Sequence, residues 1–140
     1  MTMLADSSAW IWSRRAGQPE LRQWFDAHLE EGEIVTCDQV RLELLAGVHS
    51  SQHAARVHDL AALDTCAITP REWRRAIEVQ GELARRGADL HKAVKPADLL
   101  IAAAAETAGV ELLHYDTDYA HVEEVTGQPM RWLAPRGSLR

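Results

Sequence analysis

The chain has 140 residues, of which 46% are hydrophobic and 26% are charged, and its formal net charge is −6. This length and balance are typical of one globular domain and exclude an intrinsically disordered chain. The acidic balance argues against a protein that binds nucleic acid through overall positive charge, although net charge says little about a local site. We expect a single domain over residues 1–140, of which about 134–140 form a loose tail.

Cysteine usage and the apolar runs bear on the compartment. Cys37 and Cys66 lie far apart and form no CxxC pair, which favours a reduced protein. The first residues lack a basic segment followed by a long apolar core, and no run reaches about 18 uninterrupted apolar residues. We therefore expect a cytoplasmic protein without a signal peptide or a membrane span.

Short apolar runs alternate with longer segments of helical periodicity. The expected strands are 2–5, 33–36, a weak one at 66–68, 110–114 and an edge strand at 130–133. The expected helices are 7–15, 20–31, 39–48, 52–63, 70–86 and 96–108, then a turn and helix over 116–125, with a loop at 87–94. Strands that alternate with helices pair in parallel through crossovers. The sequence therefore predicts an α/β fold: a small, mostly parallel sheet of about four to five strands flanked by helices in three α/β/α layers.

Five acidic residues fall near one edge of this expected sheet. Functional sites in such folds lie outside the carboxyl ends of the strands. Asp6 follows the first expected strand, and Asp116 and Asp118 follow the fourth in the stretch HYDTDY. Glu43 and Asp98 lie on helices that follow other strands. We expect these acids to approach one another at the carboxyl edge.

Two of these acids share helix faces with apolar residues. Asp98 lies on the face of Ile101 and Ala105, and Glu43 lies on the face of Val40. An unpaired buried carboxylate is costly, so each needs a cation or hydrogen-bond donors.

Each acid alone has a local explanation. The helix dipole favours Asp98 in a first turn, Glu43 could pair with Arg41, and Asp116 with Asp118 could form an Asx turn. Convergence of four segments is harder to explain in this way. An all-oxygen cluster suits Mg²⁺ or Mn²⁺, and such sites serve phosphate chemistry.

Three stretches together resemble a known family. They are LADSSAWI at 4–11, the Glu43 segment ending in LELLAG, and KPADLLIAAAAETAGVELLHYDTDY. From Leu4 to about Trp132 the chain resembles a PIN domain and, more narrowly, a VapC-type toxin of a bacterial toxin–antitoxin pair. The most specific piece is Asp98 followed by LLIAAAA, a short strand and then DTD.

The resemblance implies a PIN-like fold and a Mg²⁺- or Mn²⁺-dependent endoribonuclease. The acidic positions of the family match Asp6, Glu43, Asp98 and Asp116, with Asp118 as a frequent further acid and Ser8 as a small polar support. It implies that Asp6, Asp98 and Asp116 hold a metal directly. Glu43 and Asp118 would hold it through water, complete a second site or orient the attacking water. Family analogy gives a 5′-phosphate and a 3′-hydroxyl as products.

The resemblance also implies partners: an RNA substrate such as tRNA or another structured RNA, a VapB-like antitoxin and a second copy in a homodimer. Basic residues would guide the RNA backbone, although each could equally be ordinary surface charge; the candidates are Arg14, Arg15, Arg41, Lys92 and Lys95. Three tryptophans near the N-terminus either pack in the core or form the dimer or antitoxin surface: Trp10, Trp12 and Trp24.

Other readings are weaker. A catalytically silent PIN-like module that binds RNA or protein would have a degenerate acidic set. A phosphatase of the haloacid dehalogenase type needs DxD after the first strand, where this chain has Asp6-Ser7-Ser8. His49 and His53 lie four apart, but without an HExxH glutamate or paired cysteines they do not indicate zinc. His114 either supports the acidic site or packs at the strand end.

Overall fold

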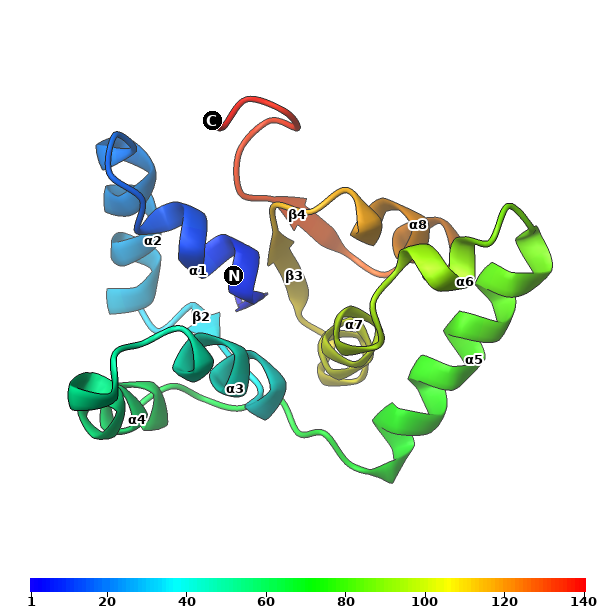
Figure 1. The fold of residues 1–140 in the computed structure, drawn as a ribbon, viewed down its shortest axis with the longest axis horizontal. Helices are drawn as coiled ribbons and strands as arrows, with labels where there is room; N and C mark the ends of the chain where they lie inside the picture. The colour runs from blue at the N-terminus through cyan, green and yellow to red at the C-terminus, as the bar shows by residue number, and fades with distance from the viewer.

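Four short strands pair in parallel at the centre of the molecule (Figure 1), in a computed structural model that describes residues 1–140. The strands are β1 (Met3–Ala5), β2 (Ile34–Val35), β3 (Glu111–His114) and β4 (Met130–Trp132), and their order in the sheet is β2-β1-β3-β4. Every neighbouring pair is parallel. The two central strands, β1 and β3, therefore end side by side at the same edge of the sheet.

Eight α-helices flank this sheet, and a 3₁₀ turn, η1 (Ser50–Gln52), precedes the fourth helix. The helices are α1 (Ser7–Ser13), α2 (Pro19–Glu30), α3 (Asp38–Ala46), α4 (His53–Ala61), α5 (Pro70–Arg86), α6 (Leu90–Ala93), α7 (Pro96–Ala108) and α8 (Asp118–Thr126). Helix α5 packs along α7 and α8, whereas α1 packs with α2 and α3 (Figure 1). This arrangement confirms the expected α/β fold with a parallel sheet flanked by helices.

Helix α7 lies against β3 with almost its whole central surface buried. Residues 99–105 of this helix are all buried, and four of them are alanines. Small side chains let a helix approach a sheet closely, and α7 packs against β3, α3, α5 and α8. At the far end, the Arg75 guanidinium of α5 donates to both carboxylate oxygens of Glu106, at 2.6 and 3.1 Å. Close packing fixes where the first turn of α7 lies relative to the strand ends.

Some predicted elements were wrong in detail. The expected strand at 66–68 is absent; the chain makes one isolated parallel bridge between Thr36 and Thr65 and then leaves the sheet edge. The reason is local: Thr69 caps α5 with a capping box that includes Glu72. The expected loop at 87–94 contains the short helix α6. The 134–140 segment has no helix or strand, and its Leu139 N–H donates to the Tyr115 hydroxyl at 2.8 Å.

Two glycines provide a matched test of the helix boundaries. Gly109 ends α7 with φ +70°, in the left-handed region, whereas Gly81 lies inside α5, where an added Cβ meets only the Arg85 side chain at 3.6 Å. We expect Gly109→Ala to destabilise the protein by about 1 kcal/mol and Gly81→Ala to stabilise it by about 0.5–1 kcal/mol. Chemical denaturation of both variants measures this. Equal signs for the two changes would contradict the assigned end of α7.

No helix has both the length and the apolar character that a membrane span requires.

Candidate active site

Asp6 directly follows β1 and caps helix α1. Its Oδ1 accepts hydrogen bonds from the Ala9 N–H at 3.0 Å and from the Ser8 hydroxyl at 2.6 Å. The side chain is only 2% exposed. Burial raises the pKa of Asp6 to about 7, the two hydrogen bonds oppose the rise, and the negative charge of Asp98 adds to it. An acid with this pKa at a strand end is poorly stabilised as a free anion and is suited to a cation.

Ser8 joins the ends of the two central strands. Its hydroxyl donates to Asp6, after β1, and accepts the Tyr115 N–H, after β3, at 2.9 Å. One hydroxyl can do both because it carries one proton and two lone pairs. The structure therefore places Ser8 in contact with Asp6, as the sequence resemblance implied, and adds a contact to β3 that the sequence did not indicate.

Asp98 lies in the first turn of α7 and is 7% exposed. Burial and, to a smaller extent, the charges of Asp116 and Glu43 raise the pKa of Asp98 to about 6, while Lys95 opposes them. Its Oδ1 lies 3.4 Å from the Tyr119 hydroxyl, and its buried Oδ2 has no hydrogen-bond partner. The structure thus brings Asp98 to the strand-end acids and leaves one of its oxygens unsatisfied.

One group of acids has the spacing of a metal site. Asp98, Asp116 and Asp118 each offer an oxygen, and these atoms lie within 4.8 Å of one another. Carboxylate oxygens are the ligands that Mg²⁺ and Mn²⁺ prefer. Asp6 is outside this group, and its Oδ1 accepts hydrogen bonds from Ser8 and from the first turn of α1.

The β3 acids are held by a compact turn. The Asp118 N–H donates to Asp116 Oδ1 at 2.9 Å, and the Asp116 N–H donates to His114 Nδ1 at 3.2 Å. Burial lowers the pKa of His114 to about 4, so the ring is neutral near pH 7 and its Nδ1 accepts. Burial, together with the charge of Asp116, raises the pKa of Asp118. His114 therefore supports this turn and also packs at the strand end, with its ring centroid 4.8 Å from that of Tyr119 and 4.7 Å from that of Trp132.

Glu43 reaches the cluster from α3. The Ser7 hydroxyl donates to its Oε2 at 3.3 Å, and its buried Oε1 has no partner. Helix α3 packs against α7, and the charge of Glu43 raises the pKa of Asp98. Glu43 and Asp98 thus each leave one buried oxygen free, and a bound cation or water would satisfy both.

Sequence reasoning missed Tyr119. This tyrosine is fully buried in the first turn of α8, and its hydroxyl faces Asp98. Burial, and then the charges of Asp6 and Asp98, raise the pKa of Tyr119 well above its usual value. The only available signal was its place three residues after Asp116 on an expected helix, which does not reveal a contact with α7.

A family model described as PIN domain matches residues 3–125. The chain belongs to the PIN domain family. Ribonuclease VapC18 of Mycobacterium tuberculosis is 40% identical over 140 residues, which are 99% of this chain and 100% of that protein. Ribonuclease VapC51 of the same organism is 33% identical over 127 residues, 90% of each chain.

Solved structures share the fold of this PIN domain. The DNA-bound VapBC of Salmonella typhimurium matches with a TM-score of 0.73 and 17% identity, over 96% of this chain and 99% of that one. VapBC2 of Rickettsia felis, bound to a DNA fragment from their promoter, matches with a TM-score of 0.72 and 14% identity, over 94% of this chain and 98% of that one. These likenesses confirm the PIN-like architecture.

The basic candidates on this PIN domain differ in their availability. The Arg41 guanidinium donates to the carbonyls of Leu60 and Leu63 at 3.0–3.4 Å, so it closes the end of α4. Arg14 Nη2 lies 2.8 Å from Asp26. The donors of Arg41 are thus occupied within the fold, whereas Arg14 keeps one buried nitrogen, Nη1, without a partner.

The remaining basic candidates are exposed. The Arg15 guanidinium lies 3.9 Å from the centroid of the Trp12 ring. Lys92 makes only an exposed contact with Asp89 at 3.8 Å. Lys95 precedes α7 and is close enough to lower the pKa of Asp98. Lys95 is therefore the basic candidate that the structure places beside the acids.

The tryptophans mostly pack within the PIN domain. Trp10 is buried edge-on against Phe25, with ring centroids 4.8 Å apart, and Trp12 stacks on Tyr115 at 5.4 Å. Trp24 is partly buried beside His28. Core packing is thus the first role of Trp10.

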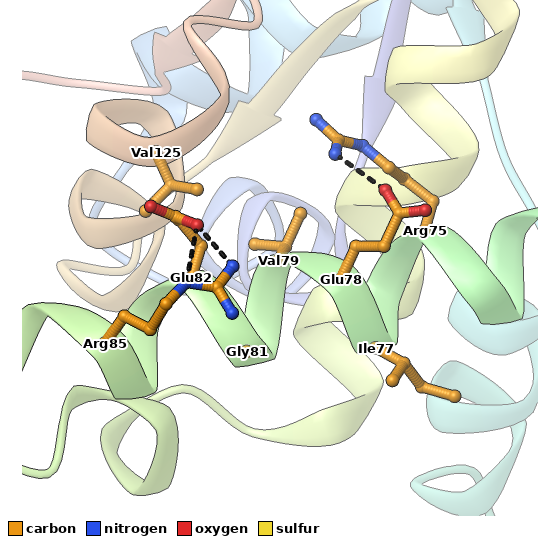
Figure 2. Close-up of a pocket in the computed structure, with 8 residues that line it drawn as sticks. All are labelled: Arg75, Ile77, Glu78, Val79, Gly81, Glu82, Arg85 and Val125. Carbon is orange, nitrogen blue, oxygen red and sulfur yellow. Dashed lines mark hydrogen bonds and ion pairs between the residues drawn. The ribbon is translucent and has the colours of Figure 1, made fainter.

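The largest surface hollow of the PIN domain lies away from the acids. It has a volume of about 530 Å³ and runs along α5, near Val125 of α8 (Figure 2). Figure 2 shows that its charged side chains pair within the helix, Arg75 with Glu78 and Arg85 with Glu82. With its charged side chains paired in this way, the hollow offers no evident ligand-binding group.

Proposed function

We propose that this PIN domain is the endoribonuclease toxin of a VapBC-type toxin–antitoxin pair, which hydrolyses RNA phosphodiester bonds and inhibits translation until its antitoxin neutralises it. One observation carries the proposal: Asp98, Asp116 and Asp118 gather at the carboxyl edge of the sheet, and a buried Asp98 oxygen has no partner. The names of the relatives, Ribonuclease VapC18 and Ribonuclease VapC51, support it. A tRNA or another structured RNA is the proposed substrate.

Asp98, Asp116 and Asp118 would hold Mg²⁺ or Mn²⁺. Asp6 would complete the ligand set or a second site from the β1 side. When bound, the divalent cation supplies positive charge for the phosphoryl oxygens and makes a water molecule a better nucleophile. Without it, the cluster repels the RNA backbone, because its net charge is negative.

Glu43 is the proposed residue that orients the attacking water. Its Oε2 is held by the Ser7 hydroxyl, whereas its Oε1 is buried and free to accept a proton from a nearby water. Attack on phosphorus in line with the leaving 3′ oxygen gives a 5′-phosphate and a 3′-hydroxyl. Lys95, Lys92 and Arg15 would guide the backbone, whereas the donors of Arg41 are used within the fold.

An apolar hollow between α1, α3 and α4 is the proposed antitoxin surface. It has a volume of about 380 Å³, and its lining residues are Trp10, Ile11, Arg14, Leu44, Val48, Arg56 and Leu60. Trp10 Nε1 and Arg14 Nη1 are buried there without hydrogen-bond partners. A partner segment would bind this hollow through apolar side chains, and the two donors would be satisfied only if the hollow rearranged on binding.

The exposed face of α5 is the proposed homodimer surface. Trp73 is 55% exposed and Ile77 is 65% exposed, one helical turn apart. Large apolar side chains exposed side by side favour an interface. Light scattering on the purified chain measures the oligomeric state.

RNA cleavage by the purified protein tests the nuclease assignment. We expect cleavage that requires Mg²⁺ or Mn²⁺, stops with EDTA and leaves 5′-phosphate ends. Mapping of RNA 5′ ends after induction in cells identifies the target. RNA binding without cleavage under every divalent ion would instead favour a silent binding module.

A further inference from the structure

Tyr119 is a fully buried phenol that faces carboxylates. It lies in the first turn of α8, and its ring packs against the His114 ring at 4.8 Å between centroids. A buried tyrosine hydroxyl normally finds a hydrogen-bond partner. Its partner here is Asp98 Oδ1, at 3.4 Å. The hydroxyl therefore serves the acidic site, although the residue itself comes from outside the expected set.

The same hydroxyl acts on two acids from different elements. It donates to Asp98 Oδ1 and so lowers the pKa of Asp98 against the larger rise caused by burial, and its proximity also slightly lowers the pKa of Asp6. Asp6 belongs to the end of β1 and Asp98 to the start of α7. Tyr119 thus donates to the carboxylate at the start of α7, whereas the carboxylate at the end of β1 has its own donors in Ser8 and Ala9.

The contact divides the two oxygens of Asp98. Oδ1 faces the phenol, and Oδ2 is buried without a partner. A ligating carboxylate commonly has one oxygen held by a neighbouring group, which fixes the direction of the other. Asp98 has this arrangement. Asp98 is also the residue whose carboxylate lies with those of Asp116 and Asp118 at the spacing of a metal site.

We propose that Tyr119 is a positioning residue of the acidic site: its buried hydroxyl holds the Asp98 carboxylate through Oδ1 and leaves Oδ2 to bind a divalent cation. The proposal rests on the proposed function, because the cation is the one that the nuclease would use. Tyr119 touches neither the cation nor the RNA; it acts through Asp98.

Mn²⁺ binding to the full-length, metal-free protein tests the proposal without an RNA substrate. Tyr119→Phe removes only the hydroxyl and keeps the ring against His114. We expect its Mn²⁺ dissociation constant in calorimetry to rise by about 10–100-fold, the usual effect of losing a group that supports a metal ligand. Tyr115→Phe is the matched control, because that hydroxyl contacts only Leu139 N–H and the Pro135 carbonyl. We expect its Mn²⁺ affinity to equal that of the wild type.

Three outcomes of the Mn²⁺ titration and of the RNA cleavage assay decide between the role of Tyr119 and the nuclease assignment. Equal Mn²⁺ affinity of Tyr119→Phe and wild type would overturn the positioning role. Wild-type protein that does not bind Mn²⁺ would overturn it as well. Wild type that binds Mn²⁺ but cleaves no RNA, together with weak binding by Tyr119→Phe, would overturn the nuclease and support the role of Tyr119.

A second measurement keeps the Tyr119 hydroxyl in place and needs a variant only to assign the signals. The chain has two tyrosines, so ¹³Cζ labelling gives two NMR signals, and the one that persists in Tyr115→Phe belongs to Tyr119. Because the hydroxyl is bonded to a residue that binds the cation, we expect Mg²⁺ to shift the Tyr119 signal and leave the Tyr115 signal in place. An unmoved Tyr119 signal in protein saturated with Mg²⁺ would overturn the proposal.

Discussion

Asparagine at position 98 is expected to reduce RNA cleavage by more than about 100-fold, since loss of a group that merely supports a metal ligand already costs about 10–100-fold. One carboxylate oxygen from each of Asp98, Asp116 and Asp118 lies within 4.8 Å of the other two. The substitution removes the charge of the Asp98 carboxylate. It keeps the size of the side chain, so α7 retains its packing. Initial rates of Asp98→Asn and wild type at saturating Mn²⁺ measure the effect.

The same change is expected to stabilise the metal-free protein. Burial raises the pKa of Asp98 to about 6, from 3.8, so the charged carboxylate opposes folding at pH 7. Its removal should raise the free energy of unfolding in EDTA by up to about 3 kcal/mol, because one pKa unit corresponds to about 1.4 kcal/mol. A variant that is more stable and yet inactive cannot have lost activity through unfolding.

Asp38→Asn is the matched control for this experiment. Asp38 also lies in the first turn of a helix, α3, but its side chain is 82% exposed and contacts only Arg41. We expect its cleavage rate to stay within about twofold of the wild type, as surface substitutions change stability by about 0.5 kcal/mol or less. If Asp98→Asn protein cleaves as fast as wild type, Asp98 is not a metal-binding residue of the nuclease.

The sheet edge was predictable because it depends on local patterns and a general rule. Apolar runs at 2–5 and 110–114 gave two buried strands, and the helices between them implied parallel pairing. Parallel strands end at one edge, so Asp6 and Asp116 had to lie at the same side of the sheet. In the structure β1 and β3 are adjacent and parallel, which confirms this prediction. The prediction required no knowledge of side-chain contacts.

The contacts within the site were not predictable from periodicity. Tyr119 reaches Asp98 only because α8 packs against α7, and Arg41 reaches the Leu60 carbonyl only because α3 packs against α4. Periodicity identifies the buried face of a helix but not the polar atom opposite it. For the same reason, Arg41 resembled any other basic candidate in the sequence.

The predictions for residues 66–68 and 87–94 were wrong because local propensity there is weak and other contacts of the chain decide the structure. Residues 66–68 alternate too briefly to specify a strand, and the capping box at Thr69 draws the chain into α5. Helix α6 has four residues and follows two non-glycine residues with positive φ, Ala88 and Asp89. Such a short turn depends on its packing against α5 rather than on propensity.

Asparagine at position 6 is expected to stabilise the metal-free protein at pH 8 by up to about 4 kcal/mol, the cost of a pKa rise from 3.8 to about 7. The sign follows from linkage. The folded state holds the Asp6 proton more tightly than the unfolded state does, so its stabilising contribution is complete below pH 3.8 and is lost as the pH rises through 7. Asparagine caps a helix as well as aspartate, so the bond from Ala9 N–H persists.

The pH window isolates this carboxylate from its buried neighbour His114. Burial lowers the pKa of His114 to about 4 from 6.5, so its contribution is complete above pH 6.5 and is lost as the pH falls toward 4. Between pH 6.5 and 8 the free energy of unfolding of the wild type in EDTA should therefore fall by about 1 kcal/mol, mainly through Asp6, whereas that of Asp6→Asn should change little.

Urea unfolding across this pH range measures both slopes, with Asp59→Asn, an exposed acid on α4, as the control. Mn²⁺ should reverse the wild-type slope, because metal binding needs the carboxylates deprotonated. Asp6→Asn that is no more stable than wild type at pH 8 in EDTA would show that the fold does not oppose the charge of Asp6, and the electrostatic case for a cation beside β1 would fall with it.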